Sequence, residues 1–160
     1  MIRLVGMDVD GTLTDGGIYM DAAGGEFKRF NVKDGAGIVS LLRSGVEVAF
    51  ISGRRSGATD RRAQDLGVTR VINGTPDKLP DLTAIAAELG LDASEVAFIG
   101  DDVQDVSCMK WAGLGIAVAD ASAEALGAAD WITPRDGGAG AIRDAADYIA
   151  RINGRTNLRE

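Results

Sequence analysis

The chain has 160 residues, a length that suits one domain with a sizeable buried core. Its 24 acidic and 17 basic residues give a net charge of -7, which argues against a nucleic-acid partner. Because the chain has no histidine, histidine triads, zinc sites with imidazole ligands and phosphohistidine chemistry are excluded. With a single cysteine, no signal-peptide pattern and no apolar run long enough to cross a membrane, we expect a cytoplasmic protein.

Short apolar runs alternate with amphipathic segments along the chain. The predicted strands cover residues 4–9, 46–51, 70–72, 96–99, 115–118 and 131–132. One predicted helix carries Ile38, Leu41 and Leu42 before Gly45, and the others cover residues 58–66, 79–89 and 139–152. This alternation predicts an α/β fold, a Rossmann-like three-layer sandwich with a central parallel sheet.

Residues 16–31 interrupt this alternation and are predicted to form a protruding β-hairpin with its turn at residues 21–25. We expect a single domain over residues 1–152, because no linker, repeat or low-complexity tract divides it. Residues 153–160 are polar and are expected to form a flexible tail.

Polar residues follow four of the predicted strands, at the sheet edge where open parallel sheets bind their ligands. In chain order they are Asp8, Asp10, Gly11 and Thr12, then Ser52, Gly53 and Arg54, then Lys78, then Asp101, Asp102 and Asp105. Gathered carboxylates repel one another unless a cation lies among them, and a site of oxygen ligands favours Mg²⁺. A carboxylate nucleophile beside a carboxylate acid and base then suggests phosphoryl transfer through an aspartyl-phosphate.

These segments resemble the four-motif signature of the haloacid dehalogenase superfamily of phosphatases. The matching residues are Asp8-Val9-Asp10-Gly11-Thr12, Ser52, Lys78 and Gly100-Asp101-Asp102-Val103-Gln104-Asp105. The resemblance implies that Asp8 is the nucleophile and Asp10 the acid and base, while Ser52 and Lys78 hold the phosphoryl group. It implies Mg²⁺ ligands at Asp8, Asp10 (through its backbone carbonyl) and Asp101, with support from Asp102 and Asp105. Gly11 would leave room for the turn that brings backbone donors to the phosphate.

The segments between the motifs are too short for the cap domain of larger superfamily members, so no cap is expected. Apolar residues on the hairpin, Ile18, Tyr19, Met20, Phe27 and Phe30, suggest an oligomer interface. Residues 15–19 and 28–35 are similar to those of the tetrameric sugar-acid phosphatases of this superfamily. The resemblance implies a homotetramer in which the hairpins pack together and each subunit helps to cover its neighbour's site.

The implied substrate is 3-deoxy-D-manno-octulosonate 8-phosphate, a precursor in lipopolysaccharide synthesis. Gly53 and Arg54 after Ser52, and Asp65, favour this octulosonate type, and Arg62 matches an arginine that contacts the sugar-acid carboxylate. A nonulosonate 9-phosphate or another small phosphate ester stays open as the substrate. A phospho-acceptor receiver domain and a non-catalytic sugar-binding relative are the alternatives from other classes.

Each candidate residue also has a purely structural interpretation. Asp8 and Asp10 are compatible with a turn at a strand end, and Ser52, Asp102 and Asp105 with helix N-termini. Lys78, Arg54 and Arg62 are compatible with a solvated surface. For Asp105 the structural and the metal-supporting interpretations are equally open.

Overall fold

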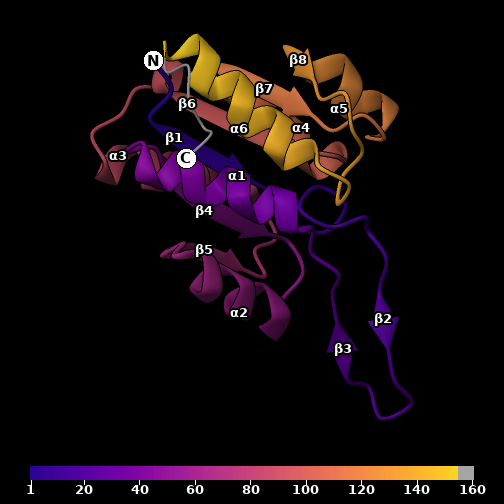
Figure 1. The fold of residues 1–160 in the computed structure, drawn as a ribbon. Helices are drawn as coiled ribbons and strands as arrows, with labels where there is room; N and C mark the ends of the chain where they lie inside the picture. Colours follow the sequence, from indigo (N-terminus) through magenta and orange to yellow (C-terminus); the bar gives the residue numbers. More distant parts are fainter. Residues whose placement is uncertain (155–160) are drawn as a thin grey trace.

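Six parallel strands form the central sheet of the protein in the computed structural model, which describes residues 1–154 (Figure 1). Their spatial order is β5-β4-β1-β6-β7-β8. The strands are β1 (Leu4–Met7), β4 (Glu47–Ser52), β5 (Arg70–Asn73), β6 (Val96–Gly100), β7 (Leu114–Ala117) and β8 (Trp131–Ile132). The predicted α/β sandwich is confirmed, and every predicted strand is present with its ends shifted by no more than two residues.

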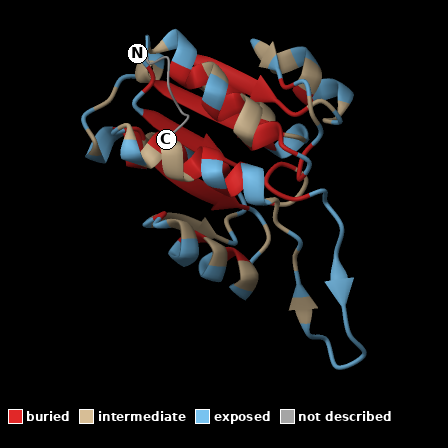
Figure 2. Ribbon diagram, viewed as in Figure 1, coloured by how far each residue is buried: buried red, intermediate tan, exposed pale blue. Residues whose placement is uncertain are grey.

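Helices cover both faces of this sheet, and the strands at its centre are coloured as buried in Figure 2. One face packs against α1 (Val32–Arg43), α2 (Gly57–Leu66) and α6 (Ala141–Ile152). The other packs against α3 (Lys78–Glu88), α4 (Val106–Trp111) and α5 (Ala123–Ala128). Because side chains alternate along a strand, Val5 and Met7 of β1 enter the first core while Leu4 enters the second.

Capping residues fix where several helices begin. The Asn31 side chain accepts hydrogen bonds from the backbone N–H groups of Lys33 and Asp34, and so starts α1 directly after the hairpin. Ser122 caps α5 in the same way, although the sequence patterns do not predict this short helix. Two 3₁₀ turns, η1 (Ala93–Glu95) and η2 (Val103–Asp105), flank β6.

The hairpin is present as predicted and projects away from the sheet (Figure 1). Its strands β2 (Tyr19–Met20) and β3 (Glu26–Phe27) pair antiparallel. The Asp21 carboxylate closes the turn by accepting hydrogen bonds from the N–H groups of Ala23 and Gly25. No cap domain lies between the motifs within residues 1–154.

The end of the chain differs from the expected flexible tail at its first residue. The Asn153 side chain exchanges two hydrogen bonds of 2.8 Å with the backbone of Ile2, so it is tied to the body of the domain. These bonds form because the end of α6 returns beside the N-terminus, a contact that local sequence cannot predict. The remaining part of the predicted tail, residues 155–160, lies outside the described residues. In the described part of the chain, no helix is long and apolar enough to cross a bilayer.

Candidate active site

The carboxyl ends of β1, β4 and β6 bring the predicted residues to one edge of the sheet. Asp8 follows β1, and Lys78 reaches it from the first turn of α3. The Lys78 Nζ atom lies 2.6 Å from Asp8 Oδ1 and 2.7 Å from Asp105 Oδ1, and all three residues are buried. Breaking a buried pair of this kind typically costs about 3–5 kcal/mol, so these contacts also hold α3 against the sheet.

Three carboxylates converge beside Lys78. Asp8, Asp101 and Asp105 each offer an oxygen, and the three oxygens lie within 4.8 Å of one another. Asp105 Oδ2 accepts hydrogen bonds from the backbone N–H groups of Asp101 and Asp102, at 3.0 and 3.2 Å. The Thr12 hydroxyl donates to Asp101 Oδ1 at 3.1 Å. Asp105 therefore shapes the loop that presents Asp101.

The electrostatics of this cluster favour a bound cation. Burial, reinforced by the Asp105 carboxylate, raises the pKa of Asp8 well above its ordinary value, although Lys78 opposes the shift. Burial likewise raises the pKa of Asp101. Burial by itself would lower the pKa of Lys78, but the Asp8 and Asp105 carboxylates outweigh it and the pKa is raised. Asp8 Oδ2 is buried without a hydrogen-bond partner, and an all-oxygen ligand set of this charge fits Mg²⁺.

Gly11 is required by the shape of the loop after β1. Its φ is +91°, in the left-handed region that favours glycine. A Cβ atom at Gly11 would also collide with the Asp101 carboxylate, and one at Gly137 would collide with the Gly11 carbonyl oxygen. Glycine at these two positions lets the segment before α6 press against the Asp8 loop.

The Asp10 side chain lies apart from the three-carboxylate cluster and forms an ion pair with Lys28 of the hairpin. Lys28 Nζ also lies 3.5 Å from Glu26 Oε1. Glu26 in turn accepts two hydrogen bonds from Arg54, 2.8 Å from Nη1 and 2.6 Å from Nη2. Sequence reasoning missed Glu26 and Lys28. Strand alternation places these two residues on one face, but nothing local indicates that this face meets Asp10.

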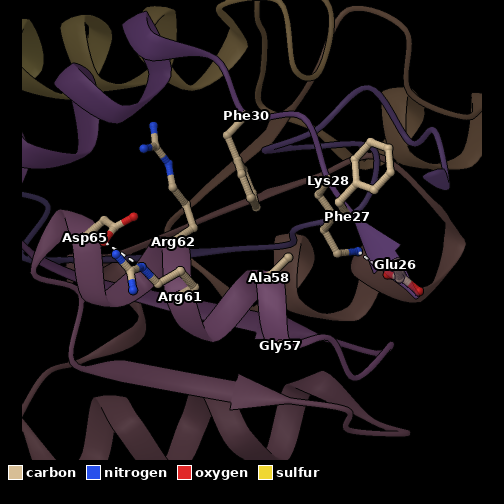
Figure 3. Close-up of a pocket in the computed structure, with 9 residues that line it drawn as sticks. All are labelled: Glu26, Phe27, Lys28, Phe30, Gly57, Ala58, Arg61, Arg62 and Asp65. Carbon is tan, nitrogen blue, oxygen red and sulfur yellow. Dashed lines mark hydrogen bonds and ion pairs between the residues drawn. The ribbon is translucent and has the colours of Figure 1, made fainter. Parts of the chain in front are cut away.

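A cavity of about 450 Å³ opens between the hairpin and α2, and Glu26 and Lys28 line it together with Phe30 and Arg62 (Figure 3). The Arg62 guanidinium lies 5.5 Å from the centre of the Phe30 ring, and its Nε is buried without a hydrogen-bond partner. Since Lys28 also contacts Asp10, the cavity adjoins the candidate active site.

The structure places the remaining candidate residues as follows. The Ser52 hydroxyl is buried at the end of β4 and donates to the Arg54 carbonyl oxygen at 2.9 Å, so it closes the turn that contains Gly53. Asp102 is exposed and lies outside the three-carboxylate cluster, where it accepts a 2.7 Å hydrogen bond from the Val103 N–H and caps η2.

Burial raises the pKa of the Cys108 thiol to about 12, so this cysteine is no nucleophile at neutral pH.

Several known proteins are similar to this chain in sequence. A family profile described as haloacid dehalogenase-like hydrolase matches residues 66–143. The 3-deoxy-D-manno-octulosonate 8-phosphate phosphatase KdsC of Yersinia pestis is 43% identical over 161 residues, which cover 98% of this chain and 86% of that protein. The chain belongs to the 3-deoxy-D-manno-octulosonate 8-phosphate phosphatase family of haloacid dehalogenase-like hydrolases. The family member KdsC of Escherichia coli K12 is 41% identical over 154 residues, covering 96% of this chain and 82% of that protein.

A solved structure of this family has nearly the same fold. The phosphatase from Moraxella catarrhalis superposes with a TM-score of 0.94 and 40% sequence identity, covering 97% of this chain and 89% of that chain. It was crystallised in complex with a magnesium ion, a phosphate ion and a KDO molecule. The predicted membership of the haloacid dehalogenase superfamily is thereby confirmed.

Proposed function

We propose that this protein is a magnesium-dependent phosphatase that hydrolyses 3-deoxy-D-manno-octulosonate 8-phosphate to the free sugar acid and phosphate. The observation that carries the proposal is the buried contact of Asp8 with Lys78, beside the three converging carboxylates. The substrate and the metal are inferred from the relatives, whose names and bound molecules state them.

The carboxylates of Asp8 and Asp101 and the backbone carbonyl of Asp10 are the proposed Mg²⁺ ligands, with Asp102 and Asp105 in support. When bound, the ion would neutralise the negative charge on the nucleophile and on the phosphate. Lys78 supplies a second positive charge to Asp8, 2.6 Å from its Oδ1.

Hydrolysis proceeds in two steps at the side chains. A carboxylate oxygen of Asp8 bonds to phosphorus while the bond between phosphorus and the sugar oxygen breaks, and Asp10 donates a proton to that oxygen. Asp10 then takes a proton from water, which attacks the phosphorus of the aspartyl-phosphate. The bond to Asp8 breaks, phosphate leaves, and both carboxyl groups return to their starting states.

The phosphate and the sugar acid are assigned to different parts of the site. Ser52 and the backbone around Gly11 and Gly53 hold the phosphoryl oxygens. Arg54 and Arg62 hold the sugar acid, whose carboxylate suits a bidentate guanidinium. Support comes from the cavity that Arg62 lines and from its unpartnered Nε.

The domain of residues 1–152 is proposed to work as a homotetramer that assembles through the hairpin. The exposed hairpin residues Ile18, Met20 and Phe27 support this assembly. A cytoplasmic location and a place in lipopolysaccharide precursor synthesis follow from the proposed substrate.

The nucleophile and the metal are tested together. Asp8→Asn removes the attacking carboxylate oxygen and should lower kcat on the sugar-acid phosphate to below about one thousandth of the wild-type value. A chelator should abolish wild-type phosphate release, and added Mg²⁺ should restore it. Asp60→Asn changes an exposed carboxylate of α2 and serves as the matched control, with unchanged rates. Activity that survives in Asp8→Asn, or in the presence of the chelator, would contradict the mechanism.

A further inference from the structure

The hairpin delivers a lysine to the proposed acid and base. The Lys28 side chain is only 2% exposed although it follows β3 on a protruding element. Its amine contacts Asp10 Oδ1 and Glu26 Oε1, so its charge is compensated by these two carboxylates. A buried ammonium group is costly unless it is paired, and these two carboxylates supply the pairing.

The two oxygens of Asp10 have different surroundings. Oδ1 accepts from Lys28, which is the one side chain within residues 1–154 that donates to this carboxylate. Oδ2 is buried and has no hydrogen-bond partner in the described structure. One oxygen is thus anchored, and the other is left for an exchange of protons with substrate or water.

Glu26 is the second carboxylate that contacts Lys28. The Glu26 carboxylate lies 3.5 Å from Lys28 Nζ, so the two side chains lie together, while the neighbouring Phe27 is 61% exposed. Glu26 is itself held by two hydrogen bonds from Arg54, which gives a row of alternating charges from Asp10 through Lys28 and Glu26 to Arg54. The row links the hairpin to the loop after β4.

We propose that Lys28, braced by Glu26, is a positioning residue that anchors Asp10 Oδ1 and thereby directs Oδ2 at the leaving oxygen. In this proposal Lys28 acts only through Asp10 and does not contact the reacting atoms. The inference rests on the proposed function, because it assigns a support to the acid and base of that reaction.

The test is the leaving-group dependence of kcat/KM in a series of substituted phenyl phosphates, from dinitrophenyl to unsubstituted phenyl. The value of kcat/KM reports the steps up to release of the phenol. A phenol of high pKa needs a proton from Asp10 in order to leave, whereas a phenol of low pKa does not. Lys28→Met should lower kcat/KM about tenfold or more for phenyl phosphate and less than about threefold for dinitrophenyl phosphate. Lys28→Gln should likewise lose more kcat/KM on phenyl phosphate than on dinitrophenyl phosphate. It serves as the test variant if Lys28→Met does not fold.

Two further variants complete the design. Lys28→Arg keeps a cation beside Asp10 and should retain the wild-type dependence on the leaving group. Lys110→Met removes one positive charge from an exposed position on α4 and should leave the whole series unchanged. An equal loss across the series, or no loss, in folded Lys28→Met or Lys28→Gln would overturn the inference alone. A wild-type protein that hydrolyses neither the octulosonate ester nor any of these phenyl esters with Mg²⁺ would overturn the proposed function, and this inference with it.

Discussion

Asp34 is a buried carboxylate that the proposed chemistry does not use. It lies in the first turn of α1, and its Oδ1 accepts a 3.0 Å hydrogen bond from the Arg143 N–H at the start of α6. Its Oδ2 is buried without a partner. The Gly140 N-cap of α6 has no side chain, so Asp34 caps that helix from a neighbouring one.

The pH dependence of stability tests this environment. Burial raises the pKa of Asp34, although backbone donors at the start of α6 oppose the shift. The folded protein therefore binds this proton more tightly than the unfolded chain, and the associated stability is present below the unfolded pKa of about 3.9. It is lost as the pH rises through the folded pKa.

The expected result is that the free energy of unfolding of the wild type, relative to that of Asp34→Asn, decreases as the pH rises from about 4 to 7. Urea denaturation of both proteins across this range measures it. Asp60→Asn, at the exposed first turn of α2, is the control for a general effect of charge. A difference that stays flat, or that grows with pH, would show that burial does not control Asp34.

At the residue scale, the sequence predicts the centre of the site better than its surroundings. Asp8, Lys78, Asp101 and Asp105 follow strand ends or begin helices, and parallel strand ends must meet at one edge of the sheet. The pairing of Lys28 with Asp10 depends instead on the path of the hairpin between them, which local patterns do not determine.

At the element scale, predictions succeed where apolar periodicity is strong and fail where it is weak. The strands are short, mainly apolar runs, and each is predicted within two residues. Residues 119–130 are dominated by alanine and aspartate and show no apolar period, so α5 is missed despite the Ser122 cap.

The hairpin is short and exposes several apolar side chains. Its strands have two residues each, and a two-stranded hairpin is marginally stable alone in water. The Tyr19 and Phe27 rings stack at 5.1 Å, while Ile18 and Met20 remain 55% and 63% exposed. Packing against other hairpins would bury these apolar side chains.

Sedimentation equilibrium tests the assembly. The molar mass of the wild type should be four times that of one chain. The double variant with Ile18→Glu and Met20→Glu should have the mass of a single chain, because both new charges would be buried at the interface. Ile132→Glu, at an exposed apolar position on β8 of the sheet, should leave the mass unchanged. A monomeric wild type would contradict the proposed role of the hairpin.

At the scale of the whole molecule, no cap domain lies over the site within residues 1–154. The hairpin and α2 would therefore have to supply the contacts that select the substrate. The charged residues that line the cavity between them are Glu26, Lys28, Arg61, Arg62 and Asp65. Among them, the Arg62 Nε has no hydrogen-bond partner, so this guanidinium suits the carboxylate of the proposed substrate.

The most direct measurement of this account is kcat/KM for phosphate release from 3-deoxy-D-manno-octulosonate 8-phosphate. The comparison substrates are a nonulosonate 9-phosphate and p-nitrophenyl phosphate, all with saturating Mg²⁺. We predict that the octulosonate ester has the highest kcat/KM, because in the proposed site Arg54 and Arg62 would hold its carboxylate while Asp8 attacks its phosphate. An octulosonate ester that is hydrolysed no better than p-nitrophenyl phosphate would contradict the account.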